Sequence, residues 1–415
     1  MKKNLFLQLL LLSSILSITL VSCDTIDPII EEEDPLVATD PNIPVLVAAD
    51  NDFGIDLFKR ANAEKLDSNV FLSPFSVATA LAMTYNGAES TTRQAMEETL
   101  RLSELSMEEV NATYENLLQL LENLDEEVLV SIANSIWVRN TFSPNPEFLN
   151  TNEVHFNSEV TNLDFTDPNA VDIINDWVMA KTNGKIEEII NKIPDVAVMY
   201  LINAIYFKGA WQTQFDPEDT WTDFPFQQEN GETVNCDMMN LAEVDMPYFV
   251  GENFQAIDLA YGDSIWSMSI FVPQEGTSVN DLVEQLTTET WNTWTSNFQT
   301  TTLNLSMPKF TVEYKITLND ALKNMGMEIA FDEINADFSR LGPGQLFINR
   351  VLHKTFIEVT EEGTEAAAVT AVEIGNESAP LYPAVQLNRP FLYVIKERQH
   401  NTILFIGKMM NPVEE

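Results

Sequence analysis

The chain has 415 residues, of which 45% are hydrophobic and 21% are charged, and this is enough apolar material for a large buried core. Its 64 acidic and 22 basic residues give a formal net charge of −42. Because a surface of this sign repels phosphates, we expect no nucleic-acid partner and no binding to anionic membrane surfaces.

The first 23 residues have the pattern of an export signal. Lys2 and Lys3 precede an apolar stretch that runs to Val21, which is typical of a signal peptide. Residues 20–23, Leu-Val-Ser-Cys, resemble the bacterial lipoprotein box, in which the cysteine is lipidated and becomes the mature N-terminus. We therefore expect removal of residues 1–22, a lipid on Cys23 as the only link to a membrane, and an exported protein anchored to the bacterial outer membrane. A plain cleaved signal with an incidental cysteine is the alternative, and the membrane face stays open.

Residues 23–49 are predicted to form an extended tether. They contain four prolines and the acidic run Glu31-Glu32-Glu33-Asp34, which resembles surface-export signals of bacterial lipoproteins. They show no apolar periodicity, and such segments do not bury enough surface to fold. We place the folded domain at residues 50–415.

From residue 50 onward, helix and strand patterns are spread over the whole length. An apolar stripe with helical spacing begins at Phe53, residues 69–76 predict a short strand and a capped helix start, and this helix ends near Gly87. A second helix is expected at residues 106–124. Strands are expected at residues 128–138, 199–207, 267–272, 302–307, 347–359 and 390–396. Because strands and helices do not alternate strictly, the pattern favours an α+β fold over a doubly wound sheet.

Motifs typical of enzymes are absent from the sequence. The three histidines, His155, His353 and His400, do not have the spacing of metal ligands. The sequence contains neither a GxSxG nucleophile elbow nor a glycine-rich phosphate loop. We expect no enzyme activity, no metal and no cofactor, and we expect Cys236 to be a buried, inert thiol.

Residues 361–375 combine the pattern of a strand with the setting of a loop. With a period of two, one set contains only small or apolar uncharged residues: Thr364, Ala366, Ala368, Thr370, Val372 and Ile374. The alternate set carries both acids, Glu365 and Glu373. This is the pattern of a half-buried strand, yet residues 375–383 have the composition of an exposed loop. An ordinary edge strand is the alternative interpretation.

This segment resembles the hinge of the reactive loop of inhibitory serpins. The hinge residues are Glu362, Gly363, Thr364, Glu365, Ala366, Ala367, Ala368 and Val369. Further segments resemble family blocks in the family's order: residues 69–81, 203–211, 307–310, 318–331, 336–339, 351–356, 388–391 and 405–412. The resemblance implies the serpin fold, a single domain of three β-sheets and eight or nine helices, with an exposed reactive-centre loop at about residues 361–387.

The resemblance also implies a mechanism of irreversible suicide inhibition. A serine protease would attack the loop as a substrate and form a covalent 1:1 acyl-enzyme, with cysteine proteases left open as a further target class. The cleaved loop would then enter the main β-sheet as a new strand and trap the protease, a strand addition that is an established example of this kind of recognition. The family's shutter, which governs opening of this sheet, maps onto Ser73, Ser76, Asn203 and His353.

Two counts along the loop give different reactive bonds. Counting forward from Gly363 at the usual family length places the bond between Glu377 and Ser378. Counting back from residues 388–391 places it two residues later, at Ala379. Because a proline follows Ala379 and makes a poor cleavage site, we favour Glu377–Ser378. Cleavage after Asn376, or after Val372 or Ile374, stays open.

The charge of the chain and its resemblance to the family indicate which partners to expect. Residues 101–127 would include the helix that some animal serpins use to bind heparin, but here the segment is rich in glutamate and has one arginine. We therefore expect no polyanion cofactor, and we expect a monomer. The alternative function is that of a non-inhibitory serpin that binds a partner at the cell surface.

Overall fold

The computed structural model describes residues 40–364 and 382–413. Its α-helices are α1 (Ile43–Ala63), α2 (Pro74–Tyr85), α3 (Ser90–Thr99), α4 (Met107–Asn123), α5 (Pro146–His155), α6 (Ala170–Lys181), α7 (Val279–Gln285), α8 (Thr288–Ser296) and α9 (Asn319–Leu322). Its strands are β1 (Val70–Leu72), β2 (Val128–Arg139), β3 (Ser158–Leu163), β4 (Met199–Ala210), β5 (Trp221–Gln227), β6 (Thr233–Val250), β7 (Phe254–Tyr261), β8 (Trp266–Pro273), β9 (Gln299–Pro308), β10 (Phe310–Thr317), β11 (Leu352–Val359), β12 (Gly363–Thr364), β13 (Ala384–Gln386), β14 (Phe391–Glu397) and β15 (Ile403–Met409).

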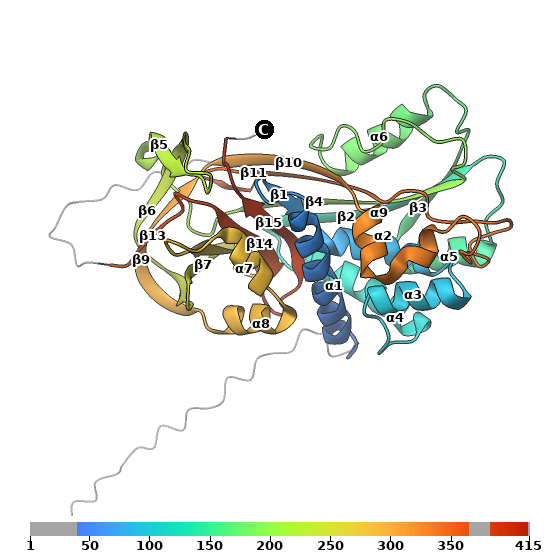
Figure 1. Cartoon of the computed structure of the whole chain (residues 1–415), viewed down its shortest axis with the longest axis horizontal. Helices are drawn as coiled ribbons and strands as arrows, with labels where there is room; N and C mark the ends of the chain where they lie inside the picture. The colour runs from blue at the N-terminus through green and yellow to red at the C-terminus, as the bar shows by residue number, and fades with distance from the viewer. Residues whose placement is uncertain (1–39, 365–381, 414–415) are drawn as a thin grey trace, which may run out of the picture.

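A six-stranded sheet in the order β10-β11-β12-β4-β2-β3 forms one layer of the molecule. Helix α6 lies on one side of this sheet, and helices α2 to α5 and α9 lie on the other (Figure 1). The neighbours of the short strand β12 are both antiparallel to it, although β11 and β4 are about 140 residues apart in the sequence. This layer contains the candidate site.

The remaining strands form one connected network. Its order is β1-β15-β14-β8-β7-β6-β9-β13, with β5 on the free edge of β6. The 18-residue strand β6 has a register shift between Leu241 and Val244, and such an irregularity bends a strand. Its first part therefore belongs to a small sheet with β5, β9 and β13, while its end pairs with β7 in a second sheet. The predicted α+β fold with three sheets is confirmed, as is the predicted number of helices within the described residues.

The folded domain begins earlier than the sequence analysis expected. Helix α1 starts at Ile43, and the side chains of Ile43, Leu46 and Val47 are buried at helical spacing. A proline in the first helical turn is compatible with this start because its missing N–H would have no partner there. The prediction of an extended tether is thus wrong for residues 43–49. Residues 1–39, with the signal peptide and Cys23, lie outside the described residues.

One predicted strand is shorter than expected. Strand β11 begins at Leu352, so the prediction is wrong for residues 347–351. The backbone N–H of Val351 donates to Asn319 Oδ1 at 2.9 Å, and that of Ile348 donates to the Ala330 carbonyl at 2.8 Å. These residues bond to other segments in place of a neighbouring strand. The other predicted strands agree with the structure to within a few residues at each end.

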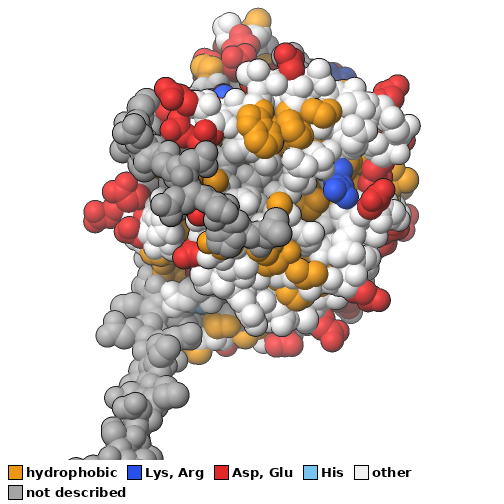
Figure 2. Space-filling view, turned by 90° about the vertical axis from the view of Figure 1, so that its left-hand side faces the viewer, with side chains coloured by type: hydrophobic (Ala, Val, Ile, Leu, Met, Phe, Trp, Pro, Cys, Tyr) orange, Lys and Arg blue, Asp and Glu red, His pale blue; other side chains and the backbone are white. Residues whose placement is uncertain are grey.

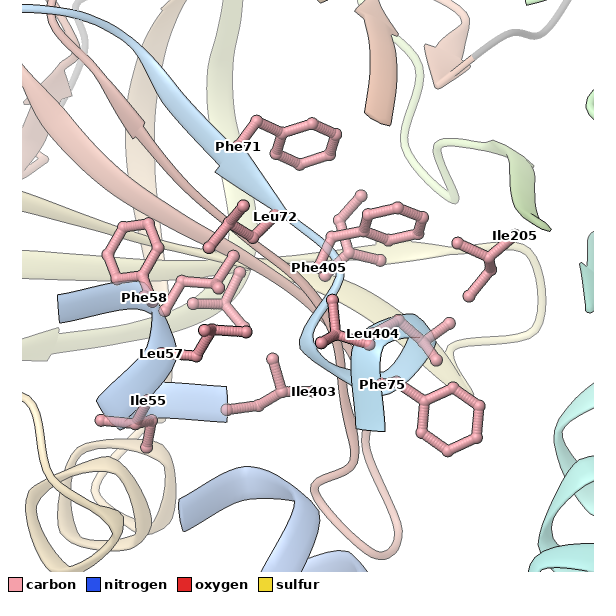
Figure 3. Packing of buried hydrophobic residues seen from close by; sticks show 14 of the residues in the cluster. Ile55, Leu57, Phe58, Phe71, Leu72, Phe75, Ile205, Ile403, Leu404 and Phe405 are labelled. Atoms are coloured by element: carbon pink, nitrogen blue, oxygen red, sulfur yellow. The ribbon is translucent and has the colours of Figure 1, made fainter. Parts of the chain in front are cut away.

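The core joins both sheet systems beneath the middle of the six-stranded sheet. Phe71 from β1, Phe75 from α2, Ile205 from β4 and Phe405 from β15 point into one cluster (Figure 3). The rings of Phe71 and Phe405 are stacked 5.3 Å apart. Helix α2 is buried on almost every side, which explains why its sequence is apolar with small alanines and lacks a polar face.

Among residues 40–364 and 382–413, no helix combines the length and apolarity needed to span a bilayer.

Cys236 is buried and forms no disulfide. Burial, assisted by the charge of Asp237, raises the pKa of its thiol to about 11. The predicted burial of this thiol is therefore confirmed, and the raised pKa supports the expected low reactivity.

Candidate functional site

The candidate site starts where the segment of unusual composition enters the six-stranded sheet. Thr364 is paired with Val359 of β11 on one side and with Gly209 of β4 on the other. Its side chain is 3% exposed, and its Oγ1 lies 2.7 Å from the hydroxyl of Tyr261. Thr364 belongs to the uncharged set of the alternating pattern, and its side chain is buried.

Gly363 is required at the point of entry. Its φ is +148°, a conformation that other residues rarely adopt. A Cβ atom built on Gly363 would lie 2.2 Å from the carbonyl oxygen of Gly209 and 2.7 Å from Cα of Ala210. The sheet backbone therefore approaches closely enough that only glycine fits.

A gap lies in the sheet beyond Thr364. In the described part of the chain, β4 and β11 pair with β12 but not with each other. Between their far halves lies a cavity of about 230 Å³, which is also lined by helix α2 and residues 345–351. Gly363 and Thr364 therefore occupy one end of the space that a strand between β4 and β11 would fill. No other described residue fills the rest of this space.

Three of the four predicted shutter residues are linked by hydrogen bonds. Ser73 caps α2, its Oγ accepting from the Ser76 N–H at 3.3 Å and donating to the Leu404 carbonyl at 2.8 Å. The Ser73 N–H donates to Nε2 of His353 at 2.9 Å. These bonds tie strand β11 to helix α2 and to β15.

The fourth predicted shutter residue, Asn203, is bonded elsewhere. Its Nδ2 donates to Oδ1 of Asn134 on β2 at 2.8 Å, while its own Oδ1 is buried without a hydrogen-bond partner among the described residues. Asn203, Ser76 and His353 all line the cavity. The structure therefore brings the four residues to one place, but it does not bond Asn203 to the other three.

The protonation state of His353 follows from its surroundings. Its side chain is buried, and burial lowers the pKa of His353 to about 4. It is neutral at pH 7, with Nε2 as the acceptor for Ser73. A free histidine has a pKa near 6.5, so the unfolded chain binds more protons than the folded one between about pH 4 and 6.5.

We expect the free energy of unfolding to fall as the pH drops from about 6.5 to 4, by up to about 3 kcal/mol from His353 alone. The measurement is urea unfolding of the wild type and of His353→Gln at several pH values. The difference between the two proteins isolates this residue, because Asp50, whose pKa burial raises to about 7, contributes equally to both. A difference that does not change with pH would contradict the buried neutral histidine.

The start of the hinge is held by a group of contacts that no sequence pattern indicated. Glu361 is buried, and its carboxylate lies 2.9 Å from Lys309 Nζ and accepts from Thr220 Oγ1 at 2.9 Å. Burial raises the pKa of Glu361, but Lys309, a hydrogen bond from its own backbone N–H and the hydrogen bond from Thr220 together outweigh it, and the net pKa is lowered. The Trp211 N–H donates to the Glu362 carbonyl at 2.9 Å. Lys309 and Trp211 lie in segments that resemble family blocks, but pattern alone did not indicate a contact with residue 361.

The remaining predicted site residues fall outside the described residues. These are Glu365, Ala366, Ala367, Ala368 and Val369 of the hinge, Glu377 and Ser378 with the alternatives Asn376 and Ala379, and Cys23. His155, one of the three histidines, lies 2.7 Å from Glu115 through Nδ1, and the described residues contain no group of three potential metal ligands.

Comparisons with known proteins give a consistent result. The family model described as "Serpin (serine protease inhibitor)" matches residues 48–412. Human serpin B11 is 31% identical over 390 residues, which cover 88% of this chain and 99% of that protein. The native structure of the thermophilic serpin tengpin has a TM-score of 0.80 at 37% identity and covers 88% and 94% of the two chains. Human thyroxine-binding globulin in complex with thyroxine has a TM-score of 0.83 at 30% identity and covers 90% and 100%.

Proposed function

The chain belongs to the serpin family, and from this premise we propose that it is an irreversible inhibitor of serine proteases. In this proposal the reactive loop is cleaved by the target and then enters the gap between β4 and β11. The observation that carries it is Thr364, which is buried between these two strands at one end of the gap.

The register at Thr364 supports insertion of the following residues. Because both pairings are antiparallel, Ala366 would lie opposite Ile357 and Phe207, and Ala368 would lie opposite Thr355 and Ile205. These four neighbours are buried, so only small uncharged side chains would fit between them without a free-energy penalty from steric overlap or a buried charge.

The same register gives Thr370 a specific place. It would lie opposite His353 and Asn203, beside the buried Asn203 Oδ1 that has no partner among the described residues. The Thr370 hydroxyl is a hydrogen-bond donor, so insertion would satisfy this acceptor. An unpartnered buried acceptor destabilises the native state and adds to the driving force for insertion.

The covalent step uses the chemistry of the target protease. The protease serine oxygen forms an ester with the carbonyl carbon of Glu377, the 377–378 peptide bond breaks, and the new amino group of Ser378 takes the proton. Insertion then carries the esterified Glu377 away from the loop end of the molecule before water completes hydrolysis. A glutamate at this position favours a protease that cleaves after acidic residues.

Insertion requires room for a strand along the full length of β4 and β11. Adjacent strands are about 4.8 Å apart, so β4 and β11 must lie about twice that distance from each other wherever residues beyond Thr364 enter. The bonds of Ser73 to His353 and Leu404 anchor β11 to the core beneath the gap. We propose that these bonds set the barrier that keeps the uncleaved loop outside.

The surface around the loop end gives a further indication of the target. The face from which the chain leaves and re-enters the described structure has many acidic and few basic side chains (Figure 2). A surface of this sign attracts a basic protease by long-range electrostatics and does not offer a site for heparin-like polyanions.

The decisive experiment is the formation of a covalent adduct. The protein is mixed with a glutamyl endopeptidase, elastase, trypsin and subtilisin, and we expect with at least one of them a 1:1 complex that survives boiling in SDS. Mass spectrometry of the cleaved chain then identifies the reactive bond, which we place at Glu377–Ser378. Cleavage of the loop by every protease without an adduct would show a non-inhibitory serpin.

A binding function is the second candidate. Thyroxine-binding globulin, which was solved in complex with thyroxine, shares 30% identity with this chain. This globulin shows that a protein with a similar structure can have a binding function. The uncharged residues of the hinge favour the inhibitory function, since a buried charge there would oppose insertion.

We also propose that the protein is exported and anchored through a lipid on Cys23. The support is the sequence pattern of residues 1–23. Mass spectrometry of the mature N-terminus from a membrane fraction tests this, and an unmodified Cys23 or an intact signal peptide would contradict it.

A further inference from the structure

Strand β5 carries an exposed pair of aromatic side chains. Trp221 begins the strand and is 49% exposed, although it lies opposite Met238 of β6, which is fully buried. The ring of Trp221 is stacked on that of Phe224 at 5.3 Å, and Phe224 in turn packs on the core. A tryptophan held in place by a neighbouring ring and left half exposed is the kind of side chain that contributes most to binding at protein interfaces.

A bulge places both rings on one face of β5. In a regular strand, residues three apart point to opposite faces. The register of β5 against β6 shifts between Trp221 and Phe224, and Asp223 there has a φ of +55°. The two aromatic residues therefore lie opposite Met238 and Cys236, which share a face of β6. Aspartate tolerates this backbone conformation better than most residues, and bulges re-aim side chains in this way beside functional sites.

Strand β5 lies between the two points where the reactive loop is attached. Thr220, which directly precedes Trp221, donates from Oγ1 to the Glu361 carboxylate at 2.9 Å. At the other end of the strand, the Gln227 N–H donates to the Asn388 carbonyl at 2.8 Å. Figure 1 shows β5 at the same end of the molecule as β13, to which the chain returns. A protease that binds the chain between residues 361 and 388 would therefore approach the end of the molecule on which Trp221 lies.

The charges around Trp221 favour a basic partner. Glu218 and Asp219, in the short 3-10 helix Pro217–Asp219 before the strand, are exposed, and so is Asp223. None of these three acids forms an ion pair with a lysine or arginine among the described residues. An exposed indole beside carboxylates suits a lysine or arginine side chain, which stacks on the ring and pairs with the acids.

The same charges disfavour two other occupants of this surface. A second copy of this chain would bring the acids face to face at a net charge of −42 per chain. An anionic membrane surface would be repelled for the same reason. A basic protein that is already held at the reactive loop meets neither obstacle.

We propose that Trp221, Phe224 and the three acids form a second contact surface for the target protease, and that it binds a basic loop beside the active-site cleft of that protease. This inference rests on the proposed function and adds a contact outside the reactive loop. The surface acts before the covalent step, since it speeds the association of protease and inhibitor and leaves the fate of the acyl-enzyme unchanged. It therefore discriminates between proteases that would cleave the same loop sequence.

The experiment measures two quantities with each protease, among glutamyl endopeptidase, elastase, trypsin and subtilisin, that forms the covalent adduct. These are the second-order rate constant of inhibition and the number of inhibitor molecules consumed per protease inactivated. We expect Trp221→Ala to lower the rate constant about tenfold with at least one protease and to leave the consumption unchanged. Trp221→Phe, which keeps an aromatic ring, should retain most of the rate.

A charge variant tests the acids without altering the rings. The triple variant Glu218→Gln, Asp219→Asn, Asp223→Asn should lower the rate constant with the same protease by about tenfold at low salt. At about 1 M NaCl the triple variant and the wild type should differ little, because the Debye length is then only about 3 Å.

Ile334→Ala is the matched control. Ile334 is 80% exposed, and its segment is bonded through Asp337 to Thr92 of α3, at the end of the molecule away from β5 (Figure 1). This variant should inhibit as the wild type does. If Trp221→Ala behaves like Ile334→Ala with every protease that forms the adduct, the contact surface is refuted and the proposed function stands.

Three further outcomes would also overturn the surface. A rise in the inhibitor consumed per protease would show that Trp221 acts on the hinge through Thr220 and not on the protease. A wild-type dimer in size-exclusion chromatography that Trp221→Ala abolishes would assign the surface to a second copy. If the wild type forms no adduct with any of the four proteases, the proposed function is refuted, and the surface loses its partner with it.

Discussion

Thr364→Arg is expected to turn the protein from an inhibitor into a substrate. Thr364 is 3% exposed and lies against Tyr261, so an arginine there would place an unpaired charge in the core as the strand forms. Insertion then slows while hydrolysis of the acyl-enzyme continues. Because about 1.4 kcal/mol changes a rate tenfold, we expect at least about a tenfold rise in the inhibitor molecules consumed per protease inactivated.

The assay is titration of protease activity together with SDS gels of the reaction. Glu362→Arg is the matched control, since it introduces the same side chain two residues earlier at a partly exposed position outside the inserting segment. This control should still form the adduct. Unchanged inhibition by Thr364→Arg would refute the role of the hinge.

The second expected result is a large gain in heat stability when the loop is cut between residues 375 and 380. An inserted strand of about ten residues makes backbone hydrogen bonds to both β4 and β11, and at about 1 kcal/mol each these amount to on the order of 10 kcal/mol. At about 2.1 cal/mol/K of unfolding entropy per residue, 1 kcal/mol corresponds to about 1.3 °C for a chain of this size, so we expect Tm to rise by about 10 °C or more.

Differential scanning calorimetry of intact and cleaved protein measures this gain. Thr364→Arg, cleaved in the same way, should gain much less, because it impairs insertion and not cleavage. Equal melting temperatures for intact and cleaved wild type would show that the native state is already at its lowest free energy, and inhibition by strand insertion would then be excluded.

The fold could be predicted largely from local patterns. The alternation of residues 128–138, the apolar helix that Ser73 caps and the order of the family blocks each depend on neighbours in sequence, and all appear in the structure. The errors lie where local signals compete. Prolines and acids near residue 43 indicated a tether, whereas burial of Ile43, Leu46 and Val47 stabilises a helix. The strand predicted from residue 347 begins only at Leu352, because Val351 bonds to Asn319.

Residue patterns along the chain were sufficient to recognise the family and to predict the hinge and the uncharged set of the segment proposed to insert, because side-chain size, charge and a period of two are local properties. The contacts in the folded molecule were needed to show which strands flank Thr364, that Glu361 pairs with Lys309, and that Asn203 bonds to Asn134 and not to the other shutter residues. Apart from the pairing of Thr364 with the nearby Val359, these contacts join residues that are about 50 to 155 positions apart. A pattern read along the chain contains no register between distant strands, and here that register determines which residues meet.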